Sequence, residues 1–99
     1  MAVFVGERYI PGAEQGVALA QAEQLREVMR RMAADGSPVR LLSTTFVPNE
    51  EWAFDLFEAE SGDEVRRVYD EGRVPVERVT EGVHLPGTSP SSTTEGAPR

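Results

Sequence analysis

The sequence contains no cysteine, and it has one histidine and one tryptophan among its 99 residues. Without thiols the chain has no disulfides, no thiolate metal ligands and no cysteine nucleophile, which excludes zinc fingers and iron–sulfur proteins. No apolar run approaches the roughly 20 residues that a membrane-spanning helix requires, so no membrane partner is expected. Residues 1–7 lack a basic flank and are not typical of a secretory signal, so a cytoplasmic location is expected.

Lysine is also absent, and basic residues are few beside acidic ones. All 10 basic residues are arginine, against 17 acidic residues, for a net charge of −7. Because nucleic-acid binding requires a positive surface, no nucleic-acid partner is expected. The use of arginine alone, with abundant alanine, valine and glycine, indicates a GC-rich bacterial genome.

The length suits one small domain, and the apolar pattern divides residues 1–85 into six elements. They are a strand over 2–9, a helix over 16–35, strands over 39–47 and 52–59, a helix from 61 to 72, and a less regular strand over 75–85. Residues 86–99 have no large apolar side chain, so we expect a disordered tail.

The helix boundaries have local signals. Ala18, Leu25 and Met32 repeat on one face of the first helix, and Gly36 is typical of its C-cap. Residues 61–64 match a capping box, in which the Ser61 hydroxyl accepts from the amide of residue 64 and its glutamate reaches back to the Ser61 amide.

The order β-α-β-β-α-β predicts an α+β ferredoxin-like sandwich. Right-handed crossovers place both helices on one face of a four-stranded antiparallel sheet and leave the other face bare. Yet both faces of the predicted strands carry apolar side chains. By simple alternation, Leu41 lies on the face opposite to that of Leu42 and Phe46, and Phe54 lies on the face opposite to that of Phe57. A sheet with one wet face alternates more cleanly, so we expect a homodimer that packs two bare faces together.

Two of the predicted strands contain candidate functional residues. Glu7, Arg8 and Tyr9 close the first strand, either as the ligand-contacting end of a central strand or as an ion pair with a rim aromatic. Asp55 lies among aromatic residues in the third strand, where an unpaired charge is costly to bury. It is a candidate general base, a hard metal ligand, the partner of Arg8 or Arg40, or an exposed edge residue.

The remaining candidates have weaker signals. Tyr69 lies on the apolar face of the second helix, where we expect a core aromatic with its hydroxyl at the surface rather than a catalytic acid. His84 has no carboxylate cluster near it in the sequence and is weak support for a metal site. Glu50, Glu51, Glu58 and Glu60 are expected to be solvated charges.

Two segments carry a resemblance to a known family. Glu7-Arg-Tyr-Ile-Pro-Gly12 and Ala53-Phe-Asp-Leu-Phe-Glu-Ala59, with Glu64-Val-Arg-Arg-Val-Tyr-Asp-Glu-Gly-Arg-Val-Pro75, resemble small bacterial nickel-binding-like proteins, classed as a domain of unknown function (family 4242). In the family, the first strand ends with Glu-Arg-Tyr-aromatic-Pro-Gly, and the third strand resembles Thr-Phe-Cys-Leu-Tyr-Glu-Ala. The resemblance covers about residues 2–83 and implies a dimeric ferredoxin-like fold.

The chain departs from this family at two positions where the family has side chains that bind nickel well. The family's cysteine falls on Asp55 and its helix histidine on Tyr69, so the ligands that nickel prefers are missing. The expectation is therefore a small ligand- or metal-binding dimer, with Glu7, Arg8, Tyr9, Asp55 and Tyr69 as candidate ligand-binding residues. A divalent metal is one candidate ligand, and no organic cofactor is implied. The alternatives are a cofactor-free isomerase, cyclase or monooxygenase with a small organic substrate between sheet and helices, and a purely structural or regulatory interaction module.

Overall fold

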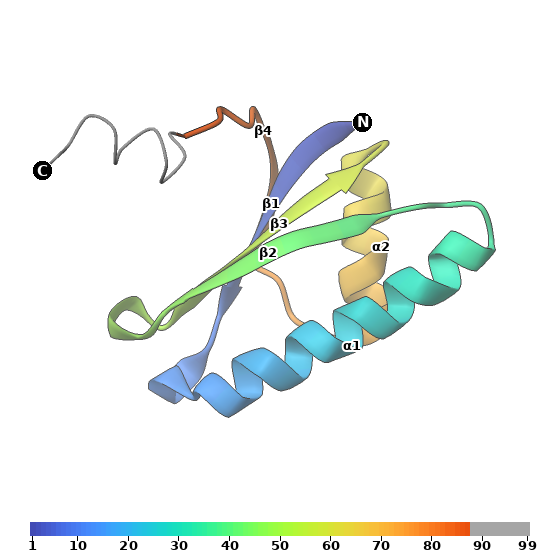
Figure 1. Cartoon of the computed structure of the whole chain (residues 1–99). Coiled ribbons are helices and arrows are strands. Elements are labelled where there is room, and N and C mark those ends of the chain that lie inside the picture. Colours follow the sequence, from blue (N-terminus) through green and yellow to red (C-terminus); the bar gives the residue numbers. More distant parts are fainter. Residues whose placement is uncertain (88–99) are drawn as a thin grey trace, which may run out of the picture.

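The computed structural model describes residues 1–87, which form a four-stranded sheet covered on one face by two helices (Figure 1). The elements in chain order are β1 (Ala2–Tyr9), the short turn η1 (Pro11–Ala13), α1 (Gln15–Ala34), β2 (Arg40–Val47), the turn η2 (Pro48–Glu50), β3 (Trp52–Ala59), α2 (Gly62–Gly72) and β4 (Arg78–Gly82). Within residues 1–87, neither helix has the length and apolar character that spanning a bilayer requires.

The strand order is β2-β3-β1-β4 and every pairing is antiparallel. The two central strands are β1 and β3, which pair with each other although η1, α1, β2 and η2 lie between them in the chain, and β1 also pairs with the last strand, β4. This arrangement confirms the predicted ferredoxin-like α+β fold. The limits of β1 and β3 are those that the apolar pattern predicts.

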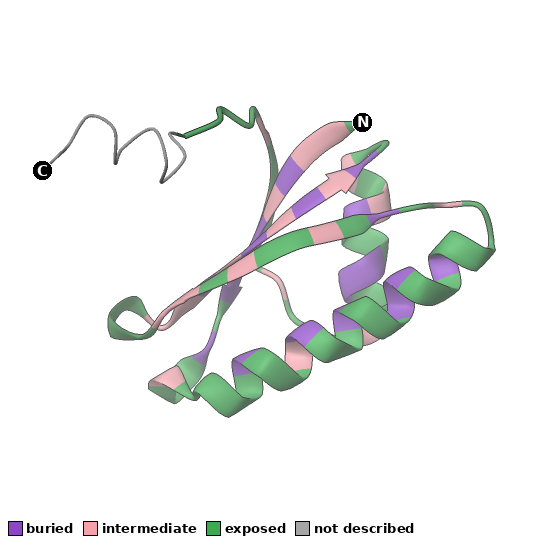
Figure 2. Ribbon diagram, in the orientation of Figure 1, coloured by how far each residue is buried: buried purple, intermediate pink, exposed green. Residues whose placement is uncertain are grey.

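The core lies between the sheet and the two helices, and Figure 2 shows buried residues along the side of α1 that faces the sheet. The larger part packs the long side chains of Leu25, Met29 and Met32 on α1 against α2 and the sheet. A smaller cluster contains Ile10, Ala18 and Ala53. The N-terminal half of α1 contributes alanines to the core, whereas the C-terminal half contributes leucine and methionine. The core is therefore thin at the N-terminal end of α1.

A β-bulge in β2 changes which of its residues face the helices. The pairing with β3 shifts between Leu41, opposite Phe57, and Ser43, opposite Leu56, so that one residue of β2 is extra. Leu41 and Phe46 both pack against the helix-side core. The expectation that Leu41 and Phe46 lie on opposite faces is therefore wrong, because simple alternation does not survive a bulge.

Two smaller expectations also need correction. The Glu64 amide does donate to the Ser61 hydroxyl, at 3.4 Å, but the Glu64 carboxylate accepts from the amide of Glu60 rather than Ser61. The last strand is shorter than predicted, and Val83 beyond it is 83% exposed. Of the predicted tail, 86–99, residues 88–99 lie outside the described part of the chain.

Candidate functional site

A fully buried ion pair lies under the middle of the sheet. Arg8 Nε donates to Asp55 Oδ2 at 2.7 Å, and Arg8 Nη2 donates to Asp55 Oδ1 at 2.9 Å. Both side chains have an exposed fraction of 0%. The two-point geometry is the strongest form of a guanidinium–carboxylate pair. Of the alternatives for Asp55, the structure shows the arginine partner, and that arginine is Arg8 rather than Arg40.

Three further side chains complete this buried polar network. The Tyr69 hydroxyl donates to Asp55 Oδ2 at 2.6 Å, and the Thr44 hydroxyl donates to Asp55 Oδ1 at 2.7 Å. Arg8 Nη1 donates to Gln21 Oε1 at 2.8 Å, which ties the network to α1. Each oxygen of Asp55 thus accepts two hydrogen bonds, and all four lone pairs of the carboxylate are in use.

A strand glycine makes room for Tyr69. Gly6 lies opposite Asp55 in the pairing of β1 with β3. A Cβ atom at Gly6 would lie 1.9 Å from the Tyr69 hydroxyl oxygen and 2.6 Å from its Cζ. Only a residue without a side chain therefore allows the tyrosine to reach Asp55 from α2. The Tyr69 ring also makes an edge contact with Phe57, at 5.6 Å between ring centroids.

The bulge in β2 supplies the last partner of Asp55. Beyond the bulge, Thr44 pairs with Asp55, and its side chain lies on the helix side of the sheet. Strict alternation from Leu41 would place Thr44 on the opposite face. The extra residue thus turns a surface threonine into part of the network.

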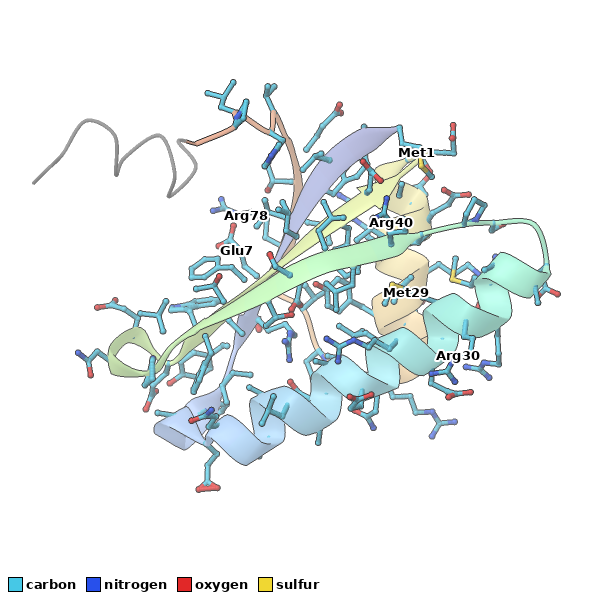
Figure 3. All side chains as sticks on the ribbon, in the orientation of Figure 1. Met1, Glu7, Met29, Arg30, Arg40 and Arg78 are labelled. Atoms are coloured by element: carbon cyan, nitrogen blue, oxygen red, sulfur yellow. The ribbon has the colours of Figure 1, made fainter. Side chains whose placement is uncertain are left out.

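The five candidate residues fall on two faces of the sheet. Arg8, Asp55 and Tyr69 meet in the network, whereas Glu7 and Tyr9 alternate to the bare face. Glu7 accepts from Arg78 Nε at 2.9 Å (Figure 3), and Tyr9 donates to Glu51 at 2.6 Å. The Tyr69 hydroxyl is buried with the rest of the residue, so its expected place at the surface is wrong.

Sequence reasoning does not identify Thr44, Gln21 or Gly6 as parts of the site. The glycine has a signal, since a glycine inside a strand marks the close approach of another group. Thr44 has none, because a bulge cannot be read from this strand. Gln21 lies beside the apolar stripe of α1 and looks like an ordinary partly exposed residue.

Burial raises the pKa of the Tyr69 phenol far above its ordinary value of 10.0, and the neighbouring Asp55 charge and hydrogen bond raise it further. A raised folded-state pKa contributes stability that is complete below pH 10 and is lost as the pH rises above it, because only the unfolded chain then ionises. We expect the free energy of unfolding to fall by about 1.4 kcal/mol per pH unit above pH 10. Denaturant melts at pH 9, 10, 10.5 and 11 measure this slope.

Tyr69→Phe is the control for this alkaline effect. The chain has two tyrosines and no lysine or cysteine, so few groups other than Tyr9 and Tyr69 change charge in this window. The variant is expected to lose the part of the slope that comes from Tyr69 and to keep any part from Tyr9. A wild-type stability that is flat between pH 10 and 11 would contradict the buried, neutral phenol.

A groove of about 420 Å³ lies between the N-terminal half of α1 and β2. Its lining residues are Gln15, Ala18, Leu19, Ala22, Arg26, Thr44, Phe46 and Pro48. The groove exists because the alanines of α1 are too short to fill the space above β2. Thr44 is the one residue that belongs both to the lining of the groove and to the network, so the groove borders the buried ion pair at Thr44.

No set of metal ligands gathers at this site. Within residues 1–87, no three histidine, cysteine, aspartate or glutamate side chains lie together where they could hold a metal ion. His84 is exposed after β4. Comparison of the chain with models of protein families, with curated proteins and with solved structures finds no match.

Proposed function

We propose that this protein binds a small organic ligand in the groove between α1 and β2. The observation that carries this proposal is the groove itself, whose volume of about 420 Å³ is in the range of small-molecule sites. Its lining is mostly apolar, with the polar groups of Gln15, Arg26 and Thr44 among the apolar side chains. A mainly apolar wall with few polar groups is typical of a site that selects one organic molecule.

The network argues for an organic ligand rather than a metal. All four lone pairs of Asp55 accept hydrogen bonds from Arg8, Thr44 and Tyr69, so the carboxylate has none left for a cation. The resemblance to nickel-binding-like proteins is compatible with a related fold whose site has changed from metal to organic ligand. A cofactor-free enzyme stays a prediction, and the same hydrogen bonds leave Asp55 no lone pair with which to act as its base.

The groove is tested with 1-anilinonaphthalene-8-sulfonate as a probe and amide chemical shifts as the readout. We expect shifts at Leu19, Thr44 and Phe46. Leu19→Glu places a carboxylate on the lining at a side chain that is 60% exposed, and it is expected to weaken binding about tenfold, or about 1.4 kcal/mol. Val17→Glu is the matched control, because Val17 is a 43% exposed residue of α1 outside the groove. Shifts confined to the bare sheet face would overturn the proposal.

We also propose a homodimer through the bare sheet face. This face is apolar at its centre, and its charged residues are matched. The central residues are Val3, Val5, Phe54 and Leu56, and the two ion pairs are Glu7–Arg78 and Arg40–Glu58, each at 2.9 Å. Figure 3 shows Glu7, Arg78 and Arg40 on the sheet. These ion pairs add no net charge, so a second copy, also at −7, meets less repulsion here than elsewhere.

Leu56→Glu is expected to convert the dimer to a monomer at micromolar concentration, because it buries two unpaired carboxylates at a symmetric contact. Light scattering after size exclusion gives the mass. Leu19→Glu adds the same charge on the opposite side of the sheet and is expected to remain dimeric. A wild-type monomer over the whole micromolar range would reject the dimer.

A further inference from the structure

The direction of one hydrogen bond determines what the groove can recognise. Asp55 is a carboxylate paired with Arg8, so it can only accept, and the Thr44 hydroxyl must donate its single proton to Asp55 Oδ1. The Thr44 oxygen then has lone pairs but no proton for any other partner. Toward the groove Thr44 is an acceptor only, and it is complemented by a ligand hydroxyl or N–H group.

The charge of the lining selects a second ligand group. Arg26 is the one charged residue of the lining, although the chain holds 17 acidic and 10 basic residues. Its only ion pair within the described residues is with Glu23, at 3.3 Å, and both side chains are at least half exposed. Exposed pairs of this kind contribute little, so a ligand carboxylate can replace Glu23 at small cost.

The positions of these two groups place them at the same end of the groove. Gln15 and Arg26 mark its limits along α1, about 16 Å apart at a rise of about 1.5 Å per residue. Because α1 and β2 run in opposite directions (Figure 1), the Gln15 end lies toward Pro48 and the Arg26 end toward Thr44. The apolar side chains of Leu19 and Phe46 lie between these ends.

We propose that the ligand is a 2-hydroxy acid with an apolar body, a conclusion that rests on the proposed groove. The carboxylate binds Arg26, the neighbouring hydroxyl donates to Thr44 Oγ1, and the apolar body lies along Leu19 and Phe46 toward Pro48. Such a ligand carries a carboxylate and a hydroxyl donor at one end and an apolar body at the other, as the lining has Arg26 and Thr44 toward one end and apolar side chains beyond them. A simple carboxylic acid leaves Thr44 without a donor, and a simple alcohol leaves Arg26 without an anion.

The experiment compares three probes: 3-phenyllactate, 3-phenylpropanoate, which lacks the hydroxyl, and 3-phenylpropane-1,2-diol, which lacks the carboxylate. We expect phenyllactate to bind about fivefold more tightly than phenylpropanoate and about tenfold more tightly than the diol. Dissociation constants come from amide shifts, which also report whether the probe lies in the groove.

Three substitutions, two at Thr44 and one at Arg26, assign each preference to its residue. Thr44→Val keeps the shape of the side chain and is expected to abolish the preference for the hydroxyl, whereas Thr44→Ser is expected to keep it. Arg26→Gln, at an exposed position, is expected to abolish the preference for the carboxylate. Melting curves of each variant show whether the fold is retained.

The outcomes separate this inference from the function on which it rests. Equal affinities of the three probes in the groove, or a hydroxyl preference that survives Thr44→Val, would overturn the hydroxy-acid assignment and leave the groove as a binding site. If neither the three probes nor 1-anilinonaphthalene-8-sulfonate shifts the groove amides, the proposed function fails and the assignment fails with it.

Discussion

Asp55→Asn is expected to lower the free energy of unfolding by about 3–5 kcal/mol, because it leaves the Arg8 guanidinium buried without a counter-charge. Asparagine has nearly the same shape, so the loss comes from charge and hydrogen bonding and not from a cavity. Its NH₂ group also points a donor at one or more of the donors of Arg8, Thr44 and Tyr69. For a domain of this size the melting temperature should fall by at least about 12 °C.

Thermal and denaturant melts of wild type and variant measure this loss. Glu71→Gln is the matched control, because Glu71 also pairs with an arginine but lies on α2, away from the bare sheet face, where its side chain is 39% exposed and that of Arg67 is 44% exposed. The control is expected to cost less than about 1 kcal/mol. Equal stability of Asp55→Asn and wild type would mean that the buried pair is not present in solution.

Gly6→Ala is expected to lower the free energy of unfolding by at least about 3 kcal/mol, through overpacking and the loss of a charged hydrogen bond. The new methyl would overlap the Tyr69 hydroxyl oxygen, at 1.9 Å, so the ring must move away from Asp55. Gly82→Ala is the matched control on β4, where nothing lies within 4 Å of the added atom. We expect that variant to be nearly neutral, and similar losses at the two glycines would contradict the close approach of Tyr69.

A double-mutant cycle identifies the residue with which the alanine collides. With Tyr69→Phe the hydroxyl oxygen is removed, although ring carbons remain 2.6 Å and 2.9 Å from the added Cβ. The loss in the double variant is therefore expected to be smaller than the sum of the two single losses. Additive losses would show that Gly6 acts through another neighbour.

The fold follows from the sequence because its signals are local. Alternation sets the limits of β1 and β3, the 3.6-residue period places Ala18 and Leu25 on the inner side of α1, and Ser61 marks the start of α2. The element order then leaves few topologies. What local signals do not contain is the bulge, which depends on how β2 meets β3 and reverses the face of Phe46.

The site is only half predictable for the same reason. Asp55 is conspicuous because a carboxylate in an apolar strand requires a partner, and Arg8 is among the partners that the sequence offers. Whether Arg8 or its neighbours Glu7 and Tyr9 face the helices depends on the register of β1 against β3, which the sequence alone does not show. The roles of Thr44 and Gln21 depend on where the fold places them relative to Asp55 and Arg8, which no local sequence pattern predicts.

The four hydrogen bonds to Asp55 also determine which arrangements the chain can adopt. Apolar side chains pack nearly as well after a strand slides by two residues, since the same face stays buried. The Asp55 carboxylate on β3 accepts from β1, β2 and α2 at once, and only one register of the strands and one position of α2 bring all of these donors to it. Replacing Arg8, Asp55, Thr44 and Tyr69 together by apolar residues of similar volume would therefore leave stability nearly unchanged or higher, while several strand alignments would become populated. The network therefore contributes more to selecting a single strand register than to the free energy of unfolding.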